Sequence, residues 1–254
     1  MRKPIHGKRA GRYSSRNNII FSLAVIGGIL VLGFCGKASA QEVIAGEPAW
    51  DVSANVSVAS DYVFRGVSQT EEDVAISGGV DFTNGFAYVG AWASNVSYAG
   101  DPETNAEVDL YGGVRPSFAG FDWDIGVVGY IYLNQPDGAD YSYAELKVGA
   151  SRAVGPATVG VTGYYSPDFF GASEDEAFYL ETAVSVSPAD RWTVSGALGR
   201  QWVSSDFDYT TWNVGAAYAL TDTLAVDVRY YDTDQHGFGD VYGSRAVVAL
   251  KAAF

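Results

Sequence analysis

The chain has 254 residues and a formal net charge of −14 at pH 7, from 16 Lys and Arg against 30 Asp and Glu. This acid excess would repel phosphate groups, so no nucleic acid is expected as a partner. A single Cys excludes a disulfide framework. The 17 Tyr, 13 Phe and 6 Trp argue against disorder, because so many aromatic side chains need a surface that buries them.

Residues 1–40 are predicted to be a secretory signal peptide. Basic residues without any acid precede an apolar stretch from Ile19 to Cys35, and Ala38-Ser39-Ala40 supplies the small residues of a cleavage site. A membrane anchor is the alternative, but the stretch is short for a span and contains three glycines. Cleavage would leave 9 basic and 30 acidic residues, and therefore a formal charge of −21, with no Cys.

After residue 50 the sequence alternates between apolar and polar residues, with the period of two that is typical of β-strands. In the first segment Val52, Val56 and Val58 fall on one face, and Ser53 and Asn55 on the other. No apolar run long enough for a membrane helix follows residue 40, so a membrane fold would have to be a closed barrel, whose backbone groups are all paired. Twelve strands are predicted, at residues 51–65, 73–83, 85–98, 104–115, 121–133, 141–152, 157–166, 177–187, 191–202, 209–219, 223–231 and 242–254.

Alternation does not distinguish a soluble barrel from a membrane barrel, but the connections do. Tight turns rich in Gly, Pro, Asn and Asp alternate along the chain with longer acidic segments, which is the asymmetry of outer-membrane barrels. The tight turns are expected at 83–85, 116–120, 153–156, 188–190 and 221–222. The long loops are expected outside the cell, at 66–72, 99–103, 134–140, 167–176, 203–208 and 232–241.

We therefore predict an all-β fold, a transmembrane antiparallel up-and-down β-barrel of about 12 strands. Residues 41–50 would form an N-terminal periplasmic segment and residues 51–254 the barrel, in the outer membrane of a Gram-negative bacterium. Aromatic residues near strand ends favour this fold, because two belts of rings are expected where lipid meets water. Those expected near the tight turns are Phe82, Phe86, Phe118, Phe121, Trp192 and Tyr218, and those near the long loops are Tyr62, Phe64, Tyr98, Tyr165, Phe178, Trp202 and Tyr230.

The last predicted strand ends in an aromatic residue, Phe254. Read backwards in steps of two, its apolar face continues as Ala252, Leu250, Val248 and Ala246. A strand of this kind is how outer-membrane barrel proteins end. Outer-membrane lipids and, through Phe254, the barrel-insertion machinery are therefore expected as partners.

Residues 60–69, with the sequence Ser-Asp-Tyr-Val-Phe-Arg-Gly-Val-Ser-Gln, resemble the N-terminal signature of the TorF porin family. Later segments match the family in the same order, at 78–82, 94–96, 107–113 and 129–132. The resemblance covers essentially the whole mature chain. It implies an outer-membrane barrel and suggests a pore for small solutes, and it brings no catalytic or ligand residues with it.

Charged residues on the polar faces of the strands are candidates for lining a pore. They could form a constriction that orients polar solutes, or cross-strand pairs that fill and stiffen a narrow interior. The acidic loops predict a preference for cations, whereas Lys147 and Arg229 would favour anions if they controlled passage. The candidates near mid-height are Asp109, Glu145, Lys147, Glu181, Asp227 and Arg229, and those nearer the outer mouth are Asp61, Arg65 and Glu107.

Arg65 and Asp61 are expected on one face at the end of the first strand, two side chains apart. As an ion pair they would either line the pore mouth or hold the base of the following loop against the wall. Gly66 is expected in a turn conformation that a side chain would hinder.

An enzyme is not predicted. His236 is the one His of the mature chain, and it lies between Gln235 and Gly237 in an acidic loop, where a solvated side chain is expected rather than a general base or a metal ligand. No catalytic residue, metal or cofactor is predicted. The sequence thus predicts a porin-like channel for passive diffusion of small polar solutes or ions. The alternative is a plugged barrel that acts as a structural or loop-based binding protein.

Overall fold

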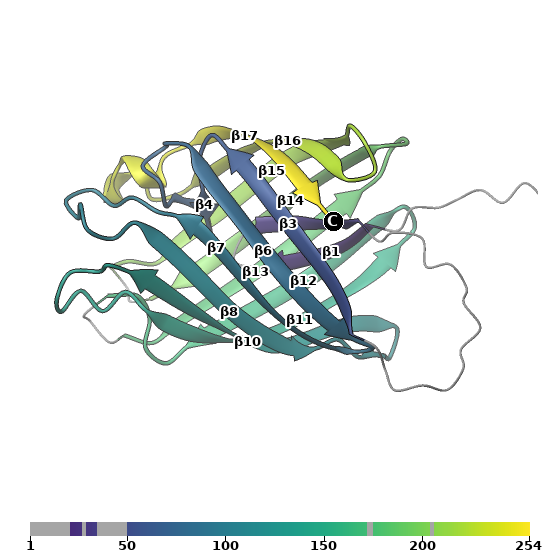
Figure 1. The fold of residues 1–254 in the computed structure, drawn as a ribbon, viewed down its shortest axis with the longest axis horizontal. Helices are drawn as coiled ribbons and strands as arrows, with labels where there is room; N and C mark the ends of the chain where they lie inside the picture. The colour runs from purple at the N-terminus through teal and green to yellow at the C-terminus, as the bar shows by residue number, and fades with distance from the viewer. Residues whose placement is uncertain (1–20, 27–28, 35–49, 172–174, 204–205) are drawn as a thin grey trace, which may run out of the picture.

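A closed 12-stranded antiparallel β-barrel dominates the computed structural model, which describes residues 21–26, 29–34, 50–171, 175–203 and 206–254. Neighbouring strands of the chain pair with each other all round the ring, and the last strand pairs with the first to close it (Figure 1). The barrel strands are β3 (Asp51–Ala59), β6 (Ala75–Asn84), β7 (Ala87–Asn95), β8 (Ala106–Val114), β10 (Phe121–Leu133), β11 (Tyr143–Val154), β12 (Ala157–Ser166), β13 (Ala177–Val186), β14 (Trp192–Trp202), β15 (Tyr209–Ala219), β16 (Leu224–Thr233) and β17 (Arg245–Ala253).

Several short elements accompany the barrel. They are β4 (Val63–Phe64), β5 (Val67–Ser68), β9 (Ser117–Phe118) and the 3-10 turns η1 (His236–Phe238) and η2 (Asp240–Tyr242). A separate pair of strands, β1 (Phe21–Ile26) and β2 (Ile29–Phe34), lies within the predicted signal peptide. The rest of residues 1–40, and 41–49 of the predicted periplasmic segment, lie outside the described residues. Within the described part of the chain, no helix has the length and apolarity needed to cross a membrane.

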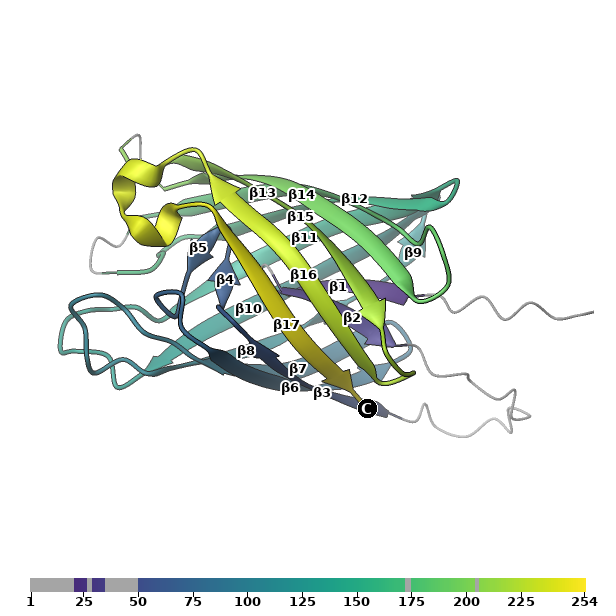
Figure 2. The same ribbon diagram turned by 90° about the horizontal axis from the view of Figure 1, so that it is seen from above.

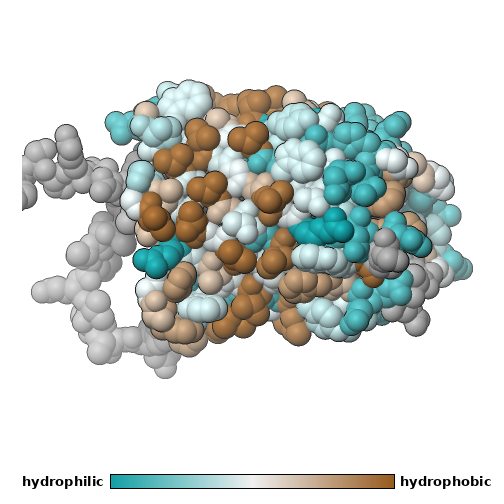
Figure 3. Space-filling model, turned by 180° about the vertical axis from the view of Figure 1, so that it is seen from behind, coloured by the Kyte–Doolittle hydropathy of each residue, from teal (hydrophilic) through white to brown (hydrophobic). Residues whose placement is uncertain are grey.

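The barrel wall is apolar outside and polar inside. In β11 the side chains of Leu146 and Val148 are more than half exposed, whereas those of Glu145 and Lys147 between them are buried. A soluble barrel would bury the apolar face instead, so this inverted alternation is the one expected for strands that contact lipid. On the face shown in Figure 3, apolar residues gather over the middle of the barrel and hydrophilic residues at the end that carries the long loops.

The two ends of the barrel differ as the sequence predicts. Two-residue connections such as Gly85–Phe86 and Gly155–Pro156 close one end. The longer loops, with η1 and η2, lie at the other (Figures 1 and 2). The predicted boundaries of most strands agree to within a few residues. The last strand begins at Arg245 rather than at residue 242, because η2 occupies 240–242.

The predicted first strand, 51–65, is wrong at its outer end. It stops at Ala59, after which the Ser60 amide donates to the Val248 carbonyl oxygen (2.9 Å) and the chain leaves the wall. The following residues turn into the lumen, where β4 and β5 lie within the ring of strands (Figure 2). We call residues 60–73 the inner hairpin. The loop predicted at 66–72 therefore lies partly inside the barrel.

The predicted aromatic belts are exposed at most of the expected positions. At the outer end Phe178 stacks on Trp202 with ring centroids 5.6 Å apart, and at the inner end Trp192 contacts Tyr218 at 4.9 Å. Three members were assigned wrongly. The inner hairpin carries Tyr62 and Phe64 into the barrel, where they are 5% and 9% exposed, and Tyr98 packs against the same buried aromatic cluster. Other exposed rings are those of Phe82, Phe86, Phe118, Tyr165 and Tyr230.

Candidate functional site

The tip of the inner hairpin is a two-residue turn. Arg65 and Gly66 both have positive φ, of 47° and 85°, as the central residues of a type I′ turn require. The tip lies against β15 and β16, close to β3 in the ring, where a Cβ atom on Gly66 would clash with Thr211 and Thr233. The sequence-based expectation for Gly66 is therefore confirmed, and the packing adds a second reason for glycine. The hairpin crosses the lumen rather than standing outside it.

Arg65 is fixed in the lumen by a two-pronged ion pair with Glu145 of β11. Nη1 donates to Oε1 at 2.9 Å and Nη2 to Oε2 at 2.6 Å, and Nη1 also donates to Gln201 Oε1 at 3.0 Å. The guanidinium carbon lies 4.9 Å from the ring centroid of Tyr164 and 4.3 Å from that of Tyr179. Planar stacking and paired donors both suit arginine. The side chains of Arg65 and Glu145 are each 1% exposed, so this ion pair is buried inside the lumen.

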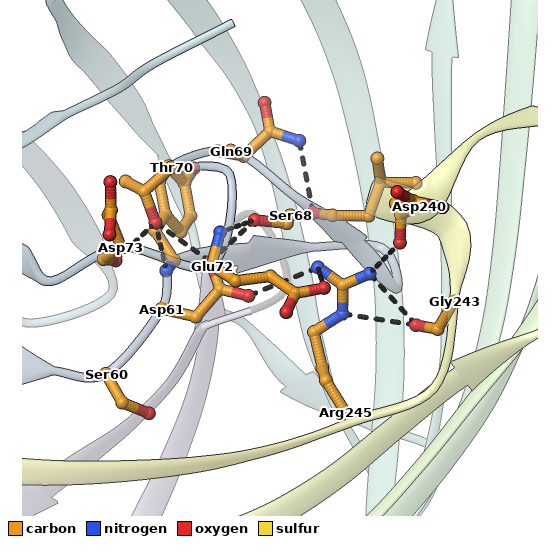
Figure 4. A network of polar contacts seen from close by, with 12 residues as sticks. Ser60, Asp61, Ser68, Gln69, Thr70, Glu72, Asp73, Asp240, Gly243 and Arg245 are labelled. Atoms are coloured by element: carbon orange, nitrogen blue, oxygen red, sulfur yellow. Dashed lines mark hydrogen bonds and ion pairs between the residues drawn. The ribbon is translucent and has the colours of Figure 1, made fainter. Parts of the chain in front are cut away.

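A second network ties the base of the hairpin to the wall (Figure 4). Asp61 Oδ1 accepts hydrogen bonds from Ser68 Oγ at 2.7 Å and from Thr70 Oγ1 at 2.8 Å. Asp61 Oδ2 lies 3.2 Å from Nη1 of Arg245, the first residue of β17. The two strands of the hairpin are thereby joined through one carboxylate.

Arg245 is held in turn by backbone oxygens of the loop before β17. Its Nε and Nη2 donate to the Gly243 carbonyl at 3.1 and 3.0 Å, and Nη2 also donates to the Asp240 carbonyl at 2.9 Å (Figure 4). Glu72 Oε1 lies 3.7 Å from Nη1. This arginine therefore links the inner hairpin, the loop that contains η2 and the last barrel strand.

The expected pairing of Arg65 with Asp61 is wrong. Asp61 pairs with Arg245 and Arg65 with Glu145. The physical reason is the turn at residues 65–66. It directs Arg65 across the lumen, whereas Asp61 stays at the seam between β3 and β17.

Tyr62 connects the hairpin to the acids of β8. Its hydroxyl donates to Glu107 Oε1 at 2.8 Å, and its ring meets Trp92 edge-on with centroids 5.3 Å apart. Burial raises the pKa of the Tyr62 hydroxyl well above its usual value, and the neighbouring Glu107 raises it further. The phenol therefore keeps its proton and remains a donor. Asp109 follows Glu107 two residues later on the same face, and both are buried.

The remaining predicted lumen residues lie on the inner face of the wall, and most have partners there. Lys147 Nζ donates to Asp124 at 2.8 Å, and Arg229 lies 3.2 Å from Asp227. Arg229 also donates to two uncharged groups, Asn213 Oδ1 at 2.8 Å and Ser195 Oγ at 2.9 Å. Glu181 Oε2 accepts from the hydroxyl of Tyr179 at 2.8 Å. Both mid-height bases are thus neutralised by neighbouring acids.

Sequence reasoning missed several members of these networks. Arg245, Asp124 and Gln201 lie on polar faces of their strands, so alternation directs them inward, but it does not reveal their partners. Alternation also placed tyrosines on the polar faces, but it did not show that they gather in one buried cluster inside the lumen. This cluster packs with the hairpin and comprises Tyr88, Tyr111, Tyr130, Tyr132 and Tyr143.

The outer mouth holds a cavity of about 680 Å³ between the hairpin base and η2. Glu71, Glu72, His236 and Asp240 contribute to its lining. His236 is largely exposed, and its Nε2 lies 2.7 Å from Asp232 Oδ1. Among the described residues, no group of three or more His, Cys, Asp or Glu side chains is placed to hold a metal ion.

Comparison with solved structures finds porins with the same fold. The KdgM porin superposes with a TM-score of 0.57 at 9% identity, over 80% of this chain and 99% of that chain. A structure of the KdgM porin in complex with disordered oligogalacturonate gives 0.55 at 8% identity, over 81% and 99% of the two chains. The NanC porin gives 0.51 at 11% identity, over 80% and 98%. At these sequence identities, the similarity shows a common fold and nothing about the solute.

Comparison of the sequence with curated proteins finds no match. Residues 44–254, which include every strand of the barrel, match a family described as a bacterial protein of unknown function (Gcw_chp). This match does not test the resemblance to the TorF family, which stays a prediction. The chain belongs to the Gcw_chp family.

Proposed function

We propose that the mature chain is a narrow outer-membrane channel for small polar solutes and ions, with a preference for cations. The inner hairpin carries this proposal, because it crosses a polar lumen inside a wall whose outer face is apolar. Twelve strands enclose more space than the eight whose side chains fill a barrel, so the interior has room that this segment narrows. The hairpin would then define the tightest section of the path.

The charges of the lumen support cations over anions. Lys147 and Arg229, the bases that would favour anions, are each bonded to an acid. The charge of Arg65 is balanced in the same way by its ion pair with Glu145. The outer loops add many acids and few bases, and their summed potential would concentrate cations at the mouth. This electrostatic pattern also disfavours a polyanion such as oligogalacturonate, the molecule bound to the KdgM porin, as the solute of this chain.

The proposed location follows from the wall and from the last strand. Val248 and Leu250 of β17 are about half exposed and Phe254 is 74% exposed, so an apolar and aromatic edge faces the surroundings. We infer that outer-membrane lipids cover this surface and that the barrel-insertion machinery reads the strand that ends in Phe254. Export through the segment 1–40 would precede that step.

A plugged barrel is the second candidate, and the 1% exposure of Arg65 and Glu145 favours it. Single-channel recording on the refolded mature chain, residues 41–254, separates the two. A channel gives discrete conductance steps, and shortening the hairpin by removing residues 63–68 increases their size. If the intact and the shortened barrel both fail to conduct, the protein belongs to the structural or binding class.

A further inference from the structure

Two carboxylates of β8 have no basic partner, unlike Asp61, Asp124, Glu145 and Asp227. Glu107 and Asp109 are 1% and 2% exposed, and both point inward from one strand. Glu107 Oε1 accepts from the Tyr62 hydroxyl. In the described part of the chain, Glu107 Oε2 and Asp109 Oδ1 are buried without a hydrogen-bond partner.

The strands on either side provide no base for this pair. Glu107 lies opposite Ser94 of β7 and Tyr132 of β10. Asp109 lies opposite Trp92 and Tyr130 on the same two strands. These neighbours are hydroxyls and rings, so they offer oxygen atoms and π-faces but no positive charge.

The charges nearby in the lumen do not compensate either. Arg65 holds Glu145 with two donors and Gln201 with one of them, and its flat faces are covered by rings. Glu145 in turn adds its own negative potential at Asp109. Two ionised carboxylates next to each other in a dry environment are strongly unfavourable, so the pair needs either a shared proton or a bound cation.

We propose that Glu107 and Asp109 form a binding site for a small alkali-metal cation such as Na⁺. Carboxylate oxygens with the hydroxyls of Tyr62 and Ser94 are the hard oxygen ligands that such ions prefer. Two carboxylates are few for Ca²⁺, which takes six to eight oxygen ligands. A weak, partly hydrated monovalent ion fits this ligand set better. The hairpin completes the site, because Tyr62 belongs to it.

The site is tested by heat-induced unfolding of the refolded mature protein in NaCl and in N-methyl-D-glucamine chloride at equal ionic strength. The organic cation is much larger than Na⁺, so it keeps the ionic strength equal without replacing Na⁺ between two carboxylates. We expect the wild-type midpoint to be about 2–4 °C higher in NaCl, because a ligand that binds the folded state stabilises it. The variant Glu107→Gln with Asp109→Asn should lose this difference. It should also match or exceed the wild-type midpoint in the organic salt, because its buried charges are gone.

The control removes two acids of the inner face that have hydroxyl partners, the half-buried Asp81 and the exposed Asp122. Asp81 accepts from Tyr111 Oη at 2.8 Å, and Asp122 accepts from Ser117 Oγ at 2.6 Å. The variant Asp81→Asn with Asp122→Asn should keep the Na⁺ effect. An equal Na⁺ effect in the Glu107/Asp109 variant would assign it to other acids and overturn the site. A wild type that responds to pH but not to Na⁺ would also overturn it, because a shared proton would then supply the charge. An open and a closed barrel would both hold the ion. A negative result here therefore refutes the cation site without refuting the proposed channel, which the conductance test addresses.

Discussion

Arg245 and Asp61 form an ion pair where the first and last strands of the barrel meet, which we call the seam. Arg245 begins the last strand and Asp61 follows the first, and their Nη1 and Oδ2 atoms are 3.2 Å apart with side chains 6% and 4% exposed. The paired residues of β17 and β3 end at Ala249 and Ala59, and the last backbone hydrogen bond joins Ser60 to Val248. The ion pair continues the contact beyond that point and fixes the base of the inner hairpin.

Removing Arg245 should destabilise the barrel more than removing a neighbouring surface charge. The Arg245→Gln variant leaves Asp61 buried without its cation, which costs about 3–5 kcal/mol when one partner of a buried pair is lost. Glu72→Gln is the control, because Glu72 is also near Arg245 but its side chain is 57% exposed; its effect should stay below about 1 kcal/mol. Chemical unfolding in detergent measures both. Equal stabilities of the two variants would contradict a structural role for the seam pair.

The tip of the hairpin can be tested with a pair of glycines. Gly66→Ala should be strongly destabilising or should unseat the hairpin, because the new methyl group meets Thr211 and Thr233. Gly138→Ala places a methyl group at a similar positive φ, of 79°, in open space. It should lower the free energy of unfolding by about 1–2 kcal/mol, through backbone strain alone. In single-channel recordings the first variant should show larger or noisier conductance and the second should resemble wild type. Wild-type behaviour of Gly66→Ala would argue against a seated hairpin.

The Arg65–Glu145 pair should control selectivity in a sign-dependent way. Glu145→Gln leaves the Arg65 cation unbalanced in the narrow section, so reversal potentials should shift towards anions. Arg65→Gln leaves the Glu145 anion, so they should shift towards cations. The double variant restores neutrality and should return close to wild type. Shifts of the same sign for both single variants would show that the pair acts through structure alone.

The acids of the outer loops should act at long range. At low salt the wild-type pore should prefer cations, and the preference should weaken as salt rises, because the screening length falls from about 30 Å at 0.01 M to about 3 Å at 1 M. Reversal potentials under a fixed salt ratio at several absolute concentrations give this dependence. A preference for anions at low salt would contradict the assignment.

The orientation in the membrane can be checked with single cysteines, because the mature chain has none. Asp137 and Asp190 are exposed at opposite ends of the barrel, in a long loop and in a tight turn. On intact cells, an impermeant thiol reagent should label Asp137→Cys and not Asp190→Cys. The reverse pattern would invert the topology.

Alternation was sufficient to predict the wall of the barrel. One face of each strand lies on the outside of the barrel and the other lines the lumen, so the pattern of Leu146 and Val148 against Glu145 and Lys147 can be read locally. The number of strands and the asymmetry of the ends followed from the same periodicity and from turn residues.

The inner hairpin was missed because it imitates a strand. Tyr62 and Phe64 alternate with Asp61 and Arg65 as a lipid-facing segment would, and the Arg-Gly tip is a weaker turn signal than Asn-Gly or Asp-Gly. A local sequence pattern cannot identify the partners of its charges, because Glu145 is 80 residues from Arg65 and Arg245 is 184 residues from Asp61. Pairings over such distances depend on the closed ring, which no local pattern encodes.

The position of Arg245 also links the hairpin to the order in which the chain is made. Asp61 and the hairpin are synthesised early, whereas Arg245 belongs to the last strand. The contacts of the hairpin with Glu107 and Glu145 involve strands that precede β17, whereas the contact of Asp61 with Arg245 needs the last strand in place beside the first. The ion pair at the seam therefore forms only when the ring closes, and it marks a complete barrel.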